Sequence, residues 1–138
     1  FSVEYAALWR CPVVDKIKYL ALEEDCMCQY DGKRIRINNV CYDFEYEIRT
    51  VLEHAGKYII LLAIPFDSEE INNIYCLDSH AKLVWQAEDL SILYPSILNL
   101  AYEHMGIKDG AIFASDFYGR SYRINIDSGK IESRSFVK

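Results

Sequence analysis

The sequence predicts a mainly β protein with two antiparallel sheet units and a short segment at the N-terminus that is either a helix or a strand. Three observations support this fold class. Aromatic residues make up 14% of the chain, with 11 Tyr, and such side chains favour pleated, half-buried surfaces. Polar and apolar residues alternate from residue 42 onward. A strand–turn–strand pattern occurs twice, with Asp-Ser pairs at Asp78 and Asp127, 49 residues apart, a spacing that suits a four-stranded repeat.

A length of 138 residues is most simply one domain, and a chain of this size buries roughly two thirds of its unfolded surface. We divide it into an N-terminal segment (1–41), a first sheet unit (42–87) and a second sheet unit (88–138). In the N-terminal segment, apolar residues over 13–22 have helical spacing, although a strand fits as well. Asp31-Gly32 then predicts a turn, followed by alternating residues 33–37.

The first sheet unit contains four predicted strands joined by short connections. Residues 43–50 alternate between charged and apolar side chains, and Ala55-Gly56 marks a turn. The apolar run 57–64 has the length of a central strand buried on both faces and ends at Pro65. After the acidic loop 67–70 come strands 71–77 and 82–86, with a turn at 78–81. Neighbours in sequence with short links predict an antiparallel meander.

The second sheet unit repeats this scheme less clearly. Residues 88–95 connect the units, and residues 96–105 fit either a strand or a helix. A buried strand is predicted at 111–114, then a strand at 118–126, a turn at 127–130 with Gly129 at a position that requires positive φ, and a last strand at 131–137. Tyr58-Ile59-Ile60 aligns with Ala111-Ile112-Phe113, 53 residues further on. The predicted core is Phe44, Tyr46, Ile48, Ile59, Leu61, Ile64, Ile74, Leu77, Val84, Trp85, Ile112, Phe113, Ile124 and Ile131.

The repeat carries Asn73, Tyr75, Asp78, Lys82 and Trp85, and the second copy keeps Gly119, Tyr122, Asp127, Gly129 and Lys130. This pattern resembles the blades of quinoprotein-type and WD-type β-propellers over residues 43–137. The resemblance implies blade-like meanders. Because a closed propeller needs four or more blades, two units imply a sandwich, an open pair of sheets or part of an oligomeric ring. No quinone cofactor is carried over, and Trp85 is expected to be a packing residue.

No catalytic signature is present, since the sequence lacks a Gly-x-Ser-x-Gly elbow, a His-Glu-x-x-His motif and a phosphate-binding glycine loop. Five unevenly spaced cysteines favour buried thiols in a reducing compartment, and hence a cytoplasmic location. Cys26 and Cys28 have no second pair at zinc-site spacing, and three histidines lie at strand ends or turns, so no metal or cofactor is predicted. The longest apolar run is too short to span a bilayer as a helix, so no membrane partner is predicted.

A net charge of −6 argues against nucleic-acid binding and favours a basic protein partner. Acidic residues cluster at 23–25, along a predicted strand and in the loop 67–70. On the strand, three carboxylates at period two would project from one face about 7 Å apart. The predicted partner-binding residues are Asp43, Glu45, Tyr46, Glu47, Asp67, Glu69 and Glu70. Solvated, functionless faces are the alternative.

These observations favour a non-enzymatic protein-binding module. The specific hypothesis, by analogy, is a bacterial immunity protein whose carboxylates cover the active site of a basic, nuclease-like toxin. The alternative is a propeller-like scaffold piece that self-associates through unpaired sheet edges. A third hypothesis is a small hydrolase or metal protein that uses Cys26, Cys28 and a histidine. The sequence leaves the oligomeric state open.

Overall fold

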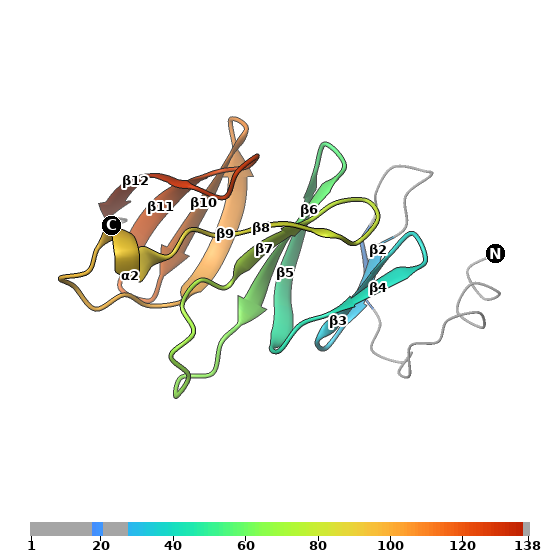
Figure 1. The fold of residues 1–138 in the computed structure, drawn as a ribbon, viewed down its shortest axis with the longest axis horizontal. Coiled ribbons are helices and arrows are strands. Elements are labelled where there is room, and N and C mark those ends of the chain that lie inside the picture. Colours follow the sequence, from blue (N-terminus) through green and yellow to red (C-terminus); the bar gives the residue numbers. More distant parts are fainter. Residues whose placement is uncertain (1–17, 21–27, 137–138) are drawn as a thin grey trace.

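Three antiparallel sheets stand one after another in the part of the chain, residues 18–20 and 28–136, that the computed structural model describes (Figure 1). Each sheet has four strands in chain order, so each is a meander. The first sheet comprises β1 (Lys18–Leu20), β2 (Cys28–Asp31), β3 (Arg34–Ile37) and β4 (Val40–Asp43). The second comprises β5 (Glu47–His54), β6 (Lys57–Ala63), β7 (Ile74–Leu77) and β8 (Leu83–Gln86). The third comprises β9 (Tyr102–Lys108), β10 (Ala111–Asp116), β11 (Arg120–Asn125) and β12 (Ile131–Phe136), and the short helix α2 (Leu90–Leu93) precedes it.

The predicted mainly β class with antiparallel meanders is confirmed, and the structure contains one sheet more than the two expected. The additional sheet is built from strands within 18–20 and 28–43, where the turn expected at Asp31-Gly32 joins β2 to β3. Lys18–Leu20, which fall within the segment read as a helix or a strand, form β1. The other residues of that segment lie outside the described residues. Cys11, Cys26 and the acidic residues 23–25 lie outside them as well.

The prediction of one acidic strand over residues 43–50 is wrong, because the chain passes from the first sheet to the second within this range. Asp43 ends β4 in the first sheet, and Glu47 begins β5 in the second. Between them Phe44 is buried in the core that these sheets share. The alternation of polar and apolar residues survives the crossing, which is why it suggested one continuous strand. The three carboxylates of Asp43, Glu45 and Glu47 therefore do not share one strand face.

The second sheet is buried on both faces, as the apolar run at 57–64 predicts. Along β6, the side chains of Tyr58, Ile60 and Leu62 pack in a core with the first sheet. Ile59 and Leu61, which alternate with them, pack in a separate core with the third sheet. All five are at most 2% exposed. The middle sheet thus contributes to two hydrophobic cores, and alternate residues of β6 belong to one core or the other.

Most of the predicted core residues are buried, with one clear exception. Val84 is 44% exposed, whereas its neighbour Trp85 is only 7% exposed, because successive residues of a strand point to opposite faces. Phe113 is half-buried on the face of the third sheet that points away from the second. Residues 96–105 form neither one helix nor one strand, since β9 begins only at Tyr102.

The second and third sheets repeat the same strand order, but the predicted alignment of their second strands, β6 and β10, is wrong by one residue. The turn Ala55-Gly56 corresponds to Asp109-Gly110, 54 residues later, and all four residues have positive φ. Tyr58 then corresponds to Ile112, and both point toward the preceding sheet. The predicted offset of 53 would pair residues on opposite faces, since a slip of one residue reverses every side chain in a strand. The turns at Asp78 and Asp127 both join the third strand of a sheet to the fourth, but the predicted offset of 49 is two residues too long. Leu77 pairs with Tyr58 and Ile124 pairs with Ile112, so the third strands correspond at an offset of 47.

Two residues of the blade-like motif, Asn73 and Trp85, link the second sheet to the third. The buried Asn73 side chain donates to the carbonyl oxygens of Leu62 (2.7 Å) and Tyr102 (3.0 Å), and accepts from the amide N–H of Tyr102 (2.9 Å). The indole N–H of Trp85 donates to the Ile126 carbonyl oxygen at 3.0 Å. Trp85 is therefore a packing residue, as expected, and its partner is the turn of the next sheet.

The outer face of the third sheet is polar. In the second sheet the face toward the third carries Ile59, Leu61, Ile74 and Cys76, all fully buried. The strand registers place Phe113, Ser115, Ser121 and Arg123 at the corresponding positions of the third sheet. Arg123 and Asn125 both bind the Glu132 carboxylate, at 2.9 Å each. This face is therefore largely polar, with Phe113 as a half-buried apolar side chain.

Candidate functional site

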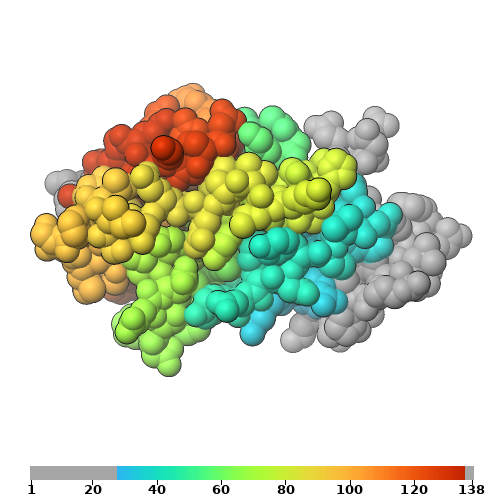
Figure 2. All heavy atoms as spheres, in the orientation of Figure 1, coloured from blue at the N-terminus to red at the C-terminus, as the bar shows by residue number. Residues whose placement is uncertain are grey.

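A groove of about 760 Å³ opens where three connections meet at one end of the second and third sheets. The connections are the loop 64–73 between β6 and β7, the segment 94–101 before β9, and the turn 117–119 between β10 and β11. Figures 1 and 2 show the first two lying next to each other at the lower left, in green and in yellow to orange. The apolar wall of the groove is formed by Ile64, Pro65, Phe66, Ile71, Ile97, Leu98, Phe117 and Tyr118, among others.

Several of these apolar side chains are strongly exposed. Phe66 is fully exposed, Phe117 is 76% exposed and Leu98 is 69% exposed. Single exposed apolar residues are common, but several large ones around one concavity mark an interaction surface. Ile92, on α2 next to the groove residue Ser91, is 75% exposed and extends the apolar character of this end.

A buried ion pair fixes two of the three connections. The guanidinium Nε of Arg120 lies 2.7 Å from a carboxylate oxygen of Asp116, and the same guanidinium donates to the Leu98 carbonyl oxygen at 2.9 Å. Asp116 also accepts from the backbone N–H of Tyr118 at 2.9 Å, which shapes the turn that presents Phe117 and Tyr118. These hydrogen bonds hold the backbone of the two connections in place, so the exposed apolar side chains project from fixed positions.

The other two contacts that shape the groove come from Asn99 and Ser68. The Asn99 amide donates to the carbonyl oxygens of Tyr94 (3.0 Å) and Leu90 (3.4 Å), which folds the segment after α2 back on itself. The Ser68 hydroxyl lies 3.0 Å from the Tyr46 hydroxyl and accepts from the Glu70 N–H at 3.2 Å. Tyr46 therefore anchors the acidic loop to the crossing between the first two sheets.

Among the described residues, three carboxylates and no Lys, Arg or His side chain line the groove. Glu103 is paired with Arg49 at 2.8 Å, and Glu70 accepts only a long bond of 3.4 Å from Gln86. Within the described residues, neither Asp67 nor Glu69 forms an ion pair. The electrostatic potential at this end is therefore negative beside an apolar surface.

The predicted partner-binding residues separate into two groups in the structure. Glu69 and Glu70 line the groove and Asp67 lies exposed in the same loop, while Tyr46 holds that loop through Ser68. Glu45 and Glu47 are exposed at the crossing between sheets. Asp43 is bound by the Arg34 guanidinium through two contacts of 2.5 and 3.1 Å, a hydrogen bond that lowers the pKa of its carboxyl group.

The apolar wall was missed from the sequence, although a signal for it exists. Phe66 follows Pro65, Ile97-Leu98 follow Pro95, and Phe117-Tyr118 precede Gly119. Pairs of large apolar residues next to Pro or Gly lie in turns, where no strand alternation can bury them. Such residues have to be covered by another element or remain exposed, and here they remain exposed.

No histidine or cysteine is found among the described residues that line the groove. No group of three or more His, Cys, Asp or Glu side chains in the part of the chain that the structure describes is placed to hold a metal ion. Cys76 is fully buried, and desolvation raises the pKa of its thiol to about 11, so the nucleophilic thiolate is scarce at neutral pH.

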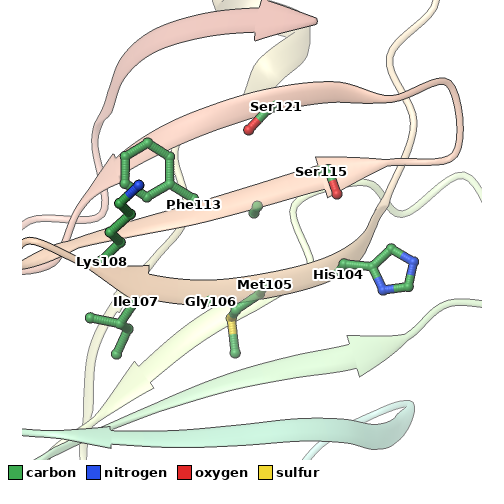
Figure 3. Close-up of a pocket in the computed structure, with 9 residues that line it drawn as sticks. His104, Met105, Gly106, Ile107, Lys108, Phe113, Ser115 and Ser121 are labelled. Atoms are coloured by element: carbon green, nitrogen blue, oxygen red, sulfur yellow. The ribbon is translucent and has the colours of Figure 1, made fainter. Parts of the chain in front are cut away.

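A second, shallower hollow of about 320 Å³ lies on the third sheet (Figure 3). Met105 and Ile107 point from β9 toward the second sheet, whereas Phe113, Ser115 and Ser121 lie on the other side of the sheet (Figure 3). Small side chains at Gly106, Ser115 and Ser121 produce the depression. It has no cluster of charged groups and is the weaker candidate.

The stacked four-stranded meanders define a fold of the β-propeller-blade type, and the solved structures that resemble it include the following two. One is a computationally designed protein, Ika8, with a TM-score of 0.60 and 6% identity, matched over 86% of this chain and 36% of that one. The other is BamB from Moraxella catarrhalis, with a TM-score of 0.60 and 15% identity, matched over 88% of this chain and 35% of that one. This chain therefore spans about a third of the length of either structure. At such low identity the likeness shows the fold alone.

The chain belongs to the family described as "Domain of unknown function (DUF7957)", whose family model matches residues 26–136. None of the curated proteins matches it in sequence. The blade-like resemblance is thus confirmed, and no comparison supports the analogy with immunity proteins. No helix among the described residues has the length and apolar character needed to cross a membrane.

Proposed function

We propose that this chain is a non-enzymatic protein-binding module that works in the cytoplasm and binds a partner through the groove formed by 64–71, 97–103 and 117–118. The observation that carries the proposal is the group of exposed apolar side chains, Phe66, Leu98 and Phe117 above all, around one ordered concavity. Exposing such side chains to water is unfavourable, by about 25 cal/mol for each Å² that a partner would cover. The blade-like sheets act as a scaffold that holds the three connections in place.

A capture experiment with matched variants tests this function. The full chain is immobilised and incubated with lysate of the source cell, and bound proteins are identified by mass. The double variant Leu98→Ser/Phe117→Ser removes apolar surface from the groove. The matched control Leu83→Ser/Val84→Ser removes two side chains that are 48% and 44% exposed on β8. We expect one partner at equal stoichiometry that the control retains and the groove variant loses. A partner that both variants retain would show that the groove is not the binding site.

The narrower hypothesis, inhibition of a basic bacterial toxin, predicts the identity of that partner. It would be a basic protein whose toxicity in a growing cell is relieved by co-expression of this chain. Relief that persists with the groove variant would place the inhibitory surface elsewhere, for example at Glu45 and Glu47.

Self-association is the second candidate function, and the exposed apolar pair Leu83 and Val84 on the edge strand β8 favours it. An edge strand with unpaired backbone groups and apolar side chains is a ready surface for a second copy. Light scattering on the purified chain separates the two functions, since a scaffold piece forms oligomers that Leu83→Lys disrupts. A monomer at every concentration would remove this alternative.

A further inference from the structure

We propose that the partner segment that occupies the groove is a peptide carrying two or more large apolar side chains directly beside Lys or Arg. This inference rests on the proposed function and specifies the chemistry of its partner. It is carried by the combination of an apolar wall and an acidic margin at one site.

The exposure of the wall indicates a polypeptide rather than an enclosed small molecule. Small-molecule sites bury about 70–90% of the ligand surface inside the protein. Here the side chain of Phe66 is fully exposed and that of Phe117 is 76% exposed, so both stand clear of the groove floor. Covering them requires a partner that is larger than the hollow and that packs against its rim as well as its floor. A peptide segment with several apolar anchors meets that requirement.

The charges around the groove select a basic segment. Glu69, Glu70 and Glu103 line it, and Asp67 lies in the same loop. Glu103 is already paired with Arg49, so a Lys or Arg of the partner would bind Glu69 and Glu70. None of the described residues that line the groove with them is cationic. Glu45 is exposed beside Tyr46, which holds the acidic loop through the Ser68 hydroxyl.

The same charges disfavour the other occupants of an apolar groove. A second copy of this chain carries a formal net charge of −6 and would bring its own acidic loop to the contact. An anionic membrane surface would repel Asp67, Glu69 and Glu70 while it accepted Phe66 and Phe117. A cationic, apolar peptide is the occupant that satisfies both parts of the surface.

Selection from a displayed library of random peptides tests the inference with the full chain as bait. We expect enriched peptides to combine aromatic or branched aliphatic residues with adjacent Lys or Arg. A synthetic enriched peptide, followed by fluorescence anisotropy, should bind the variant Glu69→Lys/Glu70→Lys at least tenfold more weakly than the unchanged chain. The control Asp127→Lys/Glu132→Lys makes the same change in net charge on the third sheet and should bind within twofold of the unchanged chain.

A charge exchange sharpens the test. When the Lys and Arg residues of the enriched peptide are replaced by Glu, it should lose binding to the unchanged chain and regain it with Glu69→Lys/Glu70→Lys. Enriched peptides without basic residues, or equal binding by that variant, would overturn the inference and leave the proposed function standing if Leu98→Ser/Phe117→Ser still abolishes binding. Peptide binding that survives the groove variant would instead overturn the proposed function itself.

Vesicles address the membrane alternative directly. Co-sedimentation with phosphatidylcholine–phosphatidylserine vesicles should leave the chain in the supernatant. Sedimentation that Phe66→Ser abolishes would contradict a peptide partner and assign the exposed aromatic residues to a lipid surface.

Discussion

Gly129 is required in the turn between β11 and β12 for two separate reasons. Its φ of +77° lies in the left-handed region, which residues with a Cβ atom adopt only at a cost. A Cβ atom at this position would also lie 2.5 Å from Cε3 of the Trp85 indole, which packs on this turn from the second sheet. The turn chemistry was predicted from the sequence, whereas the contact with Trp85 depends on how two sheets pack.

Replacing Gly129 by Ala should therefore lower the free energy of unfolding by about 2–4 kcal/mol, the sum of backbone strain and overpacking. Urea denaturation followed by circular dichroism measures the loss. Gly56→Ala is the matched control, because Gly56 has a similar φ of +79° and nothing within 4 Å of the added Cβ. It should cost only about 1 kcal/mol. Equal losses in the two variants would contradict a role for the Trp85 contact.

Asp78 organises the equivalent turn of the second sheet. Its carboxylate accepts hydrogen bonds from the backbone N–H of Lys82 (3.0 Å) and of His80 (2.8 Å), and these bonds lower the pKa of the carboxyl group. A carboxyl group with a lowered pKa in the folded state stabilises the protein above its unfolded pKa, near 3.9, and this stabilisation is lost as the pH falls through the folded value.

Asp78→Ala should thus cost about 1 kcal/mol at pH 7, and the difference from the unchanged chain should shrink as the pH drops below about 4. Thermal melts of both proteins over this pH range measure it. A difference that stayed constant, or grew, toward acid pH would show that the carboxylate does not stabilise the turn.

At the scale of elements, one buried side chain joins the second sheet to the third. Asn73 is fully buried, and its three hydrogen bonds reach Leu62 at the end of β6 and Tyr102 at the start of β9. Asn73→Ala leaves the Tyr102 N–H and two carbonyl oxygens without this partner, so we expect a loss of about 2–4 kcal/mol in urea denaturation. Asn72→Ala removes a half-buried neighbour that binds Asp89 and the Leu90 N–H, and should cost less. The reverse order would rule out Asn73 as the main link.

The strands of the second sheet were readable from sequence because their periodicity and turn residues agree. The crossing at 44–46 was not readable, since the alternation continues through it while the chain changes sheets. The one-residue error in aligning β6 with β10 has a similar origin, because five consecutive buried residues in β6 give no indication of which face each one occupies. The face that each residue of β6 occupies is defined by the sheet it packs against, and a local sequence pattern carries no information about neighbouring sheets.

For the whole molecule, burial of the second sheet on both faces predicts a gradient of stability. Amides of β6 and β7 should exchange with deuterium more slowly than those of β12, because opening the middle sheet breaks two cores whereas β12 is an edge strand with exposed side chains. Hydrogen exchange read by mass spectrometry on peptides covering 57–63 and 131–136 tests this order. Faster exchange over 57–63 than over 131–136 would contradict the central role of β6.

The acidic part of the candidate site was predicted from the sequence, whereas its apolar part was not. Acidic residues 67–70 stood out by charge alone, and Glu69 and Glu70 do line the groove. Their apolar counterpart comes from three connections that are far apart in the chain, and only the packing of the second and third sheets brings Phe66, Leu98 and Phe117 to one end. Charge clusters are local in sequence, whereas a composite apolar surface is not.

The contacts of Asn73 and Trp85 also bear on how such a chain can change its length during evolution. Both residues belong to the second repeat, yet their hydrogen-bond and packing partners include Tyr102, Ile126 and Gly129 in the third. A duplication or deletion that begins and ends at the borders of one sheet would therefore separate Asn73 and Trp85 from the residues of the next sheet that they contact. The heritable module in this architecture is the junction between two sheets, so recombination that preserves junctions should yield foldable chains more often than recombination that preserves whole sheets.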